Sequence, residues 1–102
     1  MTETVALADL TERPREVAFP GAEPKTVRLA LDAGEEIPAH RHPEREIVVH
    51  LVSGRLDVRV AGESNVLEPG ELLRFDGREE VSPTAEEDSV AVLVLAPRSD
   101  DG

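Results

Sequence analysis

Cysteine, tryptophan and tyrosine are absent from the 102 residues of this chain. Without a thiol, the chain can have no disulfide scaffold, no thiolate metal site and no cysteine nucleophile. Its apolar runs reach only about half a dozen residues, whereas a membrane-spanning helix needs roughly 20. The N-terminus also lacks the basic and then apolar segments of a secretory signal. We therefore expect a single folded domain in the cytoplasm.

Basic residues are scarce, because 11 of them face 22 acidic residues and leave a net charge of −11 at pH 7. Nucleic acids and anionic membranes are polyanions, so this charge argues against both as partners. Ten of the bases are arginine and one is lysine, and only Phe19 and Phe75 carry a benzene ring. This composition predicts adaptation to high salt, where charge repulsion is screened. The alternative is an ordinary acidic protein.

Short segments rich in valine and leucine lie between glycine-containing turns along the chain. Regular spacing of this kind predicts an all-β sandwich or barrel. Lys25–Asp32 and Arg55–Ala61 alternate apolar and polar residues, which is typical of half-buried strands. Ile47–Val52 and Val90–Ala96 are apolar on both faces. We expect these two to be central strands, or to be covered by a second subunit.

The first 23 residues are predicted to be a strand segment that joins the barrel or a dimer interface. Strands are expected around Val5–Ala8 and Glu16–Phe19, and Leu7–Thr11 is the one candidate helix. The main domain is expected to span residues 24–97. The polar residues 98–102 are predicted to form a disordered tail.

All three histidines, His40, His42 and His50, lie within eleven residues of one another. Residues two apart on a strand face the same side, so the imidazoles of His40 and His42 could share an ion. Glu46 opens the next strand, from which its carboxylate could turn back toward them. Two imidazoles and one carboxylate form a common site for Fe(II), Mn(II), Ni(II) or Zn(II). A His-x-His pair alone could equally be two histidines that form local hydrogen bonds or face solvent and bind no metal.

The spacing around these residues resembles the first motif of the cupin superfamily. That motif consists of Gly, five residues, His-x-His, three or four residues, Glu, about six residues and Gly. Here Gly34 is followed by five residues, His40-x-His42, three residues, Glu46, seven residues and Gly54. The last spacer is one residue longer than the motif, and a β-bulge would absorb the extra residue.

The second cupin motif is incomplete in this chain. The segment Leu67–Leu73 resembles its opening turn, but the position of its histidine falls on Glu80 or Val81. No histidine follows His50, so the third imidazole ligand of the family is missing. Affinity for a metal should therefore be lower than with the full ligand set.

The resemblance covers residues 24–97 and implies a double-stranded β-helix, a jelly-roll barrel with its site inside. The implied ligands of a divalent Mn, Fe, Ni or Zn ion are His40, His42 and Glu46, with His50 or Glu80 as an additional ligand. Such a protein would act on or sense a small polar molecule, for example as a metal-dependent oxygenase or isomerase. The alternative is a metal-free ligand-binding or sensor cupin without catalysis. The resemblance also implies a homodimer, and it assigns no catalytic residue or substrate.

Overall fold

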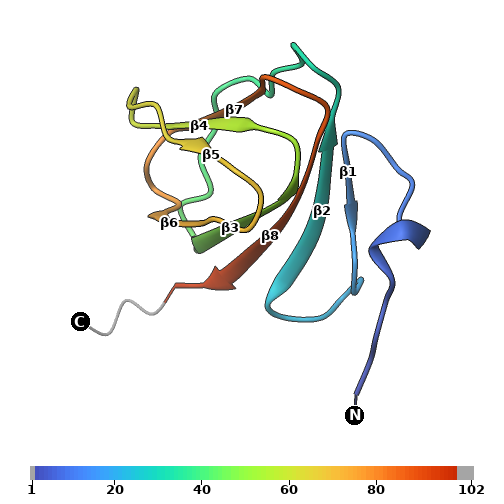
Figure 1. Ribbon diagram of the computed structural model, residues 1–102. Helices are drawn as coiled ribbons and strands as arrows, with labels where there is room; N and C mark the ends of the chain where they lie inside the picture. The colour runs from blue at the N-terminus through green and yellow to red at the C-terminus, as the bar shows by residue number, and fades with distance from the viewer. Residues whose placement is uncertain (1, 99–102) are drawn as a thin grey trace.

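The computed structural model describes residues 2–98, which form two antiparallel sheets around one core (Figure 1). The five-stranded sheet has the order β1-β2-β8-β3-β6, and the three-stranded sheet has the order β5-β4-β7. The elements are a 3-10 helix, η1 (Leu7–Asp9), and the strands β1 (Arg15–Val17), β2 (Lys25–Leu31), β3 (Arg45–Ser53), β4 (Leu56–Val60), β5 (Val66–Leu67), β6 (Leu72–Asp76), β7 (Val81–Ala85) and β8 (Ser89–Pro97). This arrangement confirms the predicted all-β double-stranded β-helix. Across residues 2–98, no helix has the length and apolar character needed to cross a bilayer.

The core lies between the two sheets because each alternating strand turns its apolar face inward. Val27, Leu29 and Leu31 of β2 are buried, and so are Leu56 and Val58 of β4. Burying an aliphatic side chain of this size contributes roughly 1.5–3 kcal/mol. Both strands that were predicted from alternation are therefore confirmed, each with the expected buried face.

Strands β3 and β8 are central in the larger sheet, as predicted, but within this chain each is buried on one face only. Ile47, Val49 and Leu51 of β3 are at most 2 % exposed, whereas Val48 and His50 on the opposite face are half-buried. The same alternation runs along β8. A single chain of this size covers only the inner face of the sheet. Coverage of the outer face by a second copy stays a prediction.

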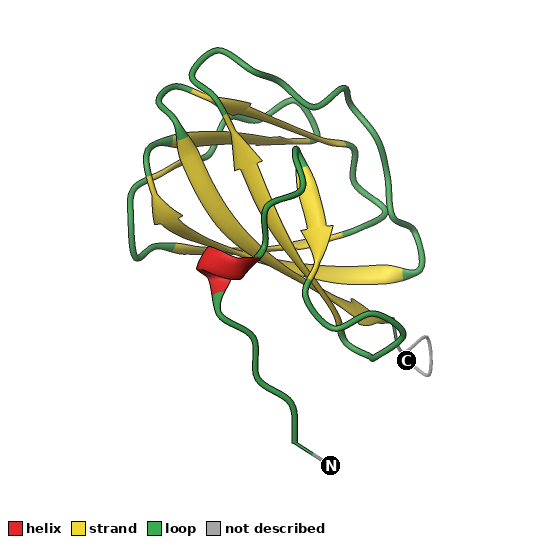
Figure 2. Ribbon diagram, turned by 90° about the vertical axis from the view of Figure 1, so that its right-hand side faces the viewer, coloured by secondary structure: helices red, strands yellow, loops and turns green. Residues whose placement is uncertain are grey.

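The N-terminal segment differs in part from its prediction. Val5–Ala8 does not form a strand, because the 3-10 helix η1 begins at Leu7. Leu10, which follows η1, is buried. Figure 2 shows η1 in front of the larger sheet, where this segment lies beside Val52 and Val90. The edge of β2 that a further strand would need is already paired with β1.

Strand β1, at Arg15–Val17, overlaps the predicted strand Glu16–Phe19 and pairs antiparallel with β2. The segment before residue 24 therefore joins the larger sheet. The predicted tail 98–102 lies outside the described residues, apart from Arg98.

The extra residue in the first motif is absorbed as expected. The pairing of β3 with β8 shifts its register between Leu51 and Ser53, which is the predicted β-bulge. Gly54 follows with a φ of +89°, and a Cβ at this position would collide with the backbone oxygen of Asp88. Only glycine meets both the conformation and the close approach.

Gly77 holds the histidine-containing loop against the end of β6. His42 N–H donates to the Gly77 carbonyl at 2.8 Å, and Gly77 N–H donates to the Arg45 carbonyl at 2.9 Å. A Cβ at Gly77 would lie inside van der Waals contact with both the His42 and the Arg45 carbonyl oxygens. These are backbone atoms, so the loop could accommodate a side chain only by moving.

Asp76 links the ends of β6 and β8 by ion pairs. Its carboxylate lies 2.8 Å from Arg78 Nη2 and 2.6 Å from Arg98 Nη1, and the Arg98 side chain is largely buried. Hydrogen bonds from the Arg78 side chain and backbone, followed by one from Arg98, hold the pKa of Asp76 well below its ordinary value. The charged form of Asp76 therefore stabilises the native state.

We expect Gly77→Ala to lower the free energy of unfolding by about 3 kcal/mol, because the new Cβ overlaps two backbone carbonyls. Urea denaturation measures this change. Gly62→Ala is the control, since a Cβ there meets nothing within 4 Å and only the φ of +80° is unfavourable. That control should lose about 1 kcal/mol. Equal losses in the two variants would contradict the steric role of Gly77.

We expect Asp76→Asn to destabilise the protein more at neutral pH than in acid. A lowered pKa in the folded state gives stability that is present above the unfolded pKa, near 3.8, and is lost as the pH falls toward the folded value. The difference in unfolding free energy between wild type and variant should therefore be constant from pH 7 to pH 5 and shrink below pH 4. Urea denaturation at pH 7, 5 and 3 checks this. A difference that does not change with pH would show that the ion pairs are not its cause.

Candidate functional site

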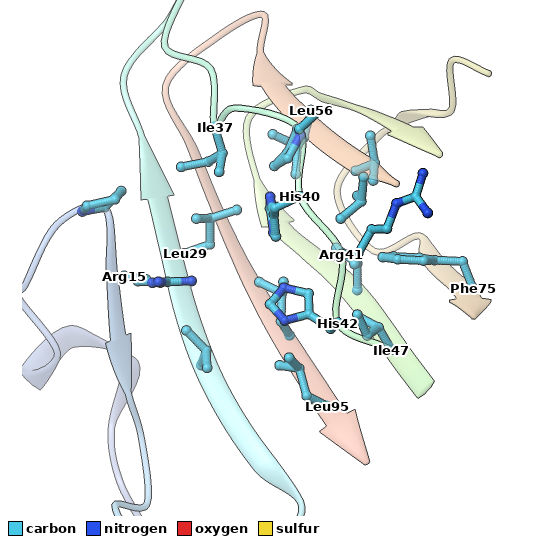
Figure 3. Close-up of a pocket in the computed structure, with 18 of the residues that line it drawn as sticks. Arg15, Leu29, Ile37, His40, Arg41, His42, Ile47, Leu56, Phe75 and Leu95 are labelled. Carbon is cyan, nitrogen blue, oxygen red and sulfur yellow. The ribbon is translucent and has the colours of Figure 1, made fainter. Parts of the chain in front are cut away.

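A cavity of about 870 Å³ lies between the two sheets (Figure 3). Its walls are mostly apolar side chains from the inner faces of β2, β3, β4 and β8, including Leu29, Ile47, Val49, Val58 and Leu95. The loop between β2 and β3 closes one side and carries His40 and His42. The alternation that forms the core therefore also leaves a largely apolar chamber with a polar side.

The two histidines are brought together as predicted. Their ring centroids lie 4.7 Å apart with the ring planes at 89°. His40 is fixed by backbone hydrogen bonds in both directions with Val81 of β7. Its Nδ1 lies 2.8 Å from the Pro38 carbonyl oxygen. A carbonyl oxygen only accepts, so Nδ1 carries the proton and the neutral ring has its lone pair on Nε2.

Glu46 is not brought together with the histidines. Its Oε1 accepts a hydrogen bond from Arg74 Nη2 at 2.8 Å, across the outer face of the larger sheet. Neighbouring residues of a strand point to opposite faces, so the burial of Ile47 turns Glu46 outward. The expectation that the carboxylate of Glu46 turns toward the two histidines is therefore wrong, because an inward Glu46 would expose Ile47, Val49 and Leu51, the most buried residues of β3.

His50 and Glu80, the two additional candidates, also lie away from the cavity lining. His50 pairs with Leu72 and Val92 on the outer face. Glu80 is exposed and precedes Val81, whose side chain faces the cavity. Within residues 2–98, no group of three His, Cys, Asp or Glu side chains is placed to hold a metal ion. Two imidazoles fall short of the three protein ligands of a typical catalytic metal site, so the described residues do not fit a centre with two histidines and one glutamate.

The polar lining of the cavity is entirely basic over the described part of the chain. Besides the two histidines, it consists of Arg15, Lys25 and Arg41. The sequence indicated that Lys25 would face the interior of the barrel, because it lies two residues before Val27 and therefore on the apolar face of the alternating strand β2. Arg15 had no comparable signal, because its position depends on the pairing of β1 opposite Leu29.

The charges around His42 lower its pKa. Burial has the largest effect, and electrostatic interactions with the neighbouring His40 and with the cations Arg15, Lys25 and Arg45 act in the same direction. Each of these effects disfavours a further positive charge on the ring. His42 is therefore neutral at pH 7 in a positive local potential.

Arg45 is occupied by a partner outside the cavity. Its guanidinium forms a bidentate ion pair with Glu23, in which Nη1 lies 2.5 Å and Nη2 3.2 Å from the two carboxylate oxygens. Nη1 also donates a hydrogen bond to the Leu95 carbonyl. The hydrogen bond from Arg45 lowers the pKa of Glu23, and the same contact raises the pKa of Arg45. Glu23 is thereby neutralised by Arg45.

Comparisons with known proteins agree on the fold. The family model of the cupin domain matches residues 27–97. The structure of KdgF from Halomonas sp. superposes with a TM-score of 0.81 at 22 % identity, covering 99 % of this chain and 98 % of that one. An RmlC-like cupin from Desulfovibrio desulfuricans superposes with a TM-score of 0.82 at 20 % identity, covering 95 % and 98 %.

A third solved structure is the cupin domain of an XRE family transcriptional regulator from Enterobacter cloacae, with a TM-score of 0.74 at 17 % identity, covering 83 % of this chain and 96 % of that one. No curated protein matches the sequence. At these identities, the solved structures establish a shared fold and nothing finer. The family model covers most of the chain, and the histidine pair occupies the matching position of the first motif. The chain therefore belongs to the cupin domain family.

Proposed function

We propose that this cupin is a binding or sensing module that holds a small organic molecule in the barrel cavity. The observation that carries the proposal is the cavity itself, about 870 Å³ with mostly apolar walls and polar groups gathered on one side. Specific small-molecule sites have this composition, in which apolar walls supply burial and a few polar groups orient the ligand.

The placement of Glu46 favours binding over metal-dependent catalysis. The carboxylate expected to complete the metal site is engaged with Arg74 outside the barrel. No carboxylate from residues 2–98 lines the cavity. The occurrence of this fold as a domain of a transcriptional regulator in Enterobacter cloacae supports a role in sensing.

A weaker metal site formed by the two imidazoles is the second candidate. It is favoured by the approach of the two rings and by the lone pair on His40 Nε2. The remaining coordination positions would be open to water or to a ligand in the cavity. Such a site would be independent of Glu46.

We expect filling the cavity to abolish ligand binding. A fragment library is screened by thermal shift, since a ligand that binds only the native state raises its stability. Leu93→Phe adds volume inside the cavity, because Leu93 lines it. Compounds that raise the melting temperature of the wild type should have no effect on this variant.

Val94→Phe is the matched control, because the adjacent residue of β8 points to the outer face. Its response to the same compounds should equal that of the wild type. The proposal is wrong if no compound raises the melting temperature, or if the stabilising compounds act equally on Leu93→Phe.

We expect any Zn²⁺ affinity to depend on His40 and not on Glu46. Isothermal titration with Zn²⁺, on protein purified without a metal-chelating tag, should show that His40→Ala removes the binding measured for the wild type. Glu46→Gln should leave the affinity within about twofold, because its carboxylate is paired with Arg74. A tenfold loss of Zn²⁺ affinity in Glu46→Gln would contradict this prediction and would support the site with two histidines and one glutamate.

A further inference from the structure

Three cations lining the cavity lack an acidic partner in a chain that is rich in acids. Within residues 2–98, Arg15, Lys25 and Arg41 form no ion pair and no side-chain hydrogen bond. The other arginines pair with an acid or, for Arg28, donate to a backbone carbonyl. With 22 acids and 11 bases, unpaired cations are the exception in this chain. All three border the same cavity.

The acids nearest to these cations in the sequence are engaged elsewhere. Glu16, next to Arg15, accepts hydrogen bonds from the N–H groups of Thr11 and Glu12 at 2.7 and 2.9 Å. Glu23, two residues before Lys25, is neutralised by its ion pair with Arg45. Neither carboxylate forms an ion pair with Arg15 or Lys25, although the charge of Lys25 is felt by Glu23.

Arg15 is directed at the polar side of the cavity, and Lys25 lines the same cavity from β2. Figure 3 shows Arg15 extending from β1 toward the side that holds His42, whereas the guanidinium of Arg41 points away from both imidazoles. Arg15 and Lys25 lie on the inner face of the paired strands β1 and β2, on either side of Val17 and Val27.

We propose that Arg15 and Lys25 recognise the headgroup of a small organic anion, a carboxylate or a phosphate monoester, whose apolar body occupies the cavity. This inference rests on the proposed function and names the class of its ligand. The two cations attract the headgroup, and the imidazole of His42, which lines the same cavity, can hydrogen-bond to it. The Debye length is about 8 Å at physiological salt, so the distant surface acids are screened more than the two cations beside the ligand.

The proposed anion site belongs to the N-terminal part of the chain. Arg15 and Lys25 both precede residue 27, where the match to the cupin model begins. Strand β1 is an edge strand of the larger sheet, and its pairing with β2 sets Arg15 opposite Leu29 at the cavity. The cupin barrel thus supplies the apolar chamber, and the preceding strand supplies a charge that selects among ligands.

The test uses the full chain and four probes that share one apolar body: hexanoate, hexyl phosphate, hexanamide and hexylammonium. Their affinities are measured by titration followed by amide NMR shifts at 0.15 M NaCl. At least one of the two anions should bind about tenfold more tightly than hexanamide, and hexylammonium should bind more weakly than hexanamide. The preference for the anion should fall in 1 M NaCl, because salt screens exposed charges.

Arg15→Gln and Lys25→Gln should each weaken the binding of the preferred anion about threefold to fivefold, as expected for exposed ion pairs. The double variant should lose about tenfold, and binding of hexanamide should not change. Arg59→Gln is the matched control, because it removes the same charge from an exposed position outside the cavity lining. Unchanged melting temperatures of the free variants would confirm that they fold.

The outcomes separate the two proposals. If hexanamide binds in the cavity as tightly as both anions, or if Arg59→Gln weakens the anion as much as Arg15→Gln does, the anion site is wrong and the binding function stands. If no probe shifts any cavity amide, the anion site is wrong, and the fragment screen alone decides the binding function. A preference for hexanoate or for hexyl phosphate assigns the headgroup as carboxylate or phosphate.

Discussion

The rest of the structure depends on which set of alternating residues of strand β3 faces the core. Ile47, Val49 and Leu51 occupy the inner face and are almost completely buried. A shift by one residue would expose all three, at roughly 1.5–3 kcal/mol for each side chain. It would also bury the carboxylate of Glu46, which is costly without a charged partner. The same alternation lines the cavity with apolar side chains and turns Glu46 outward to Arg74.

The distribution of charge divides the molecule into two electrostatic environments. Over the described residues, acids pair with arginines across the surface, whereas the polar side of the cavity is basic throughout. From its net charge alone, the protein would be expected to repel anions. Local charge decides binding at short range, since salt screens the more distant acids. The outer surface and the cavity can therefore favour ligands of opposite sign.

Local sequence patterns predicted those features that depend on neighbours in the chain. The alternation in β2 and β4 and the β-bulge before Gly54 follow from strand periodicity and motif spacing. The approach of His40 and His42 was also predicted, but from a strand, whereas the two residues lie in the loop before β3. The direction of Glu46 did not follow, because β3 carries apolar residues on both faces and its sequence does not say which face is inner. The role of Arg15 was also missed, since it depends on which strand pairs with β2.

The sequence by itself determined an all-β barrel with a pair of neighbouring histidines just before its third strand. These properties follow from period-two alternation, turn glycines and short-range spacing, all of which act over a few residues. Only the tertiary structure decided which face of β3 is buried, which side chains line the cavity, and which cations keep no acidic partner there. The physical reason is that burial and charge pairing are set by contacts between segments far apart in the chain. Residues 15, 25 and 42 come to the same cavity only after the sheets have formed.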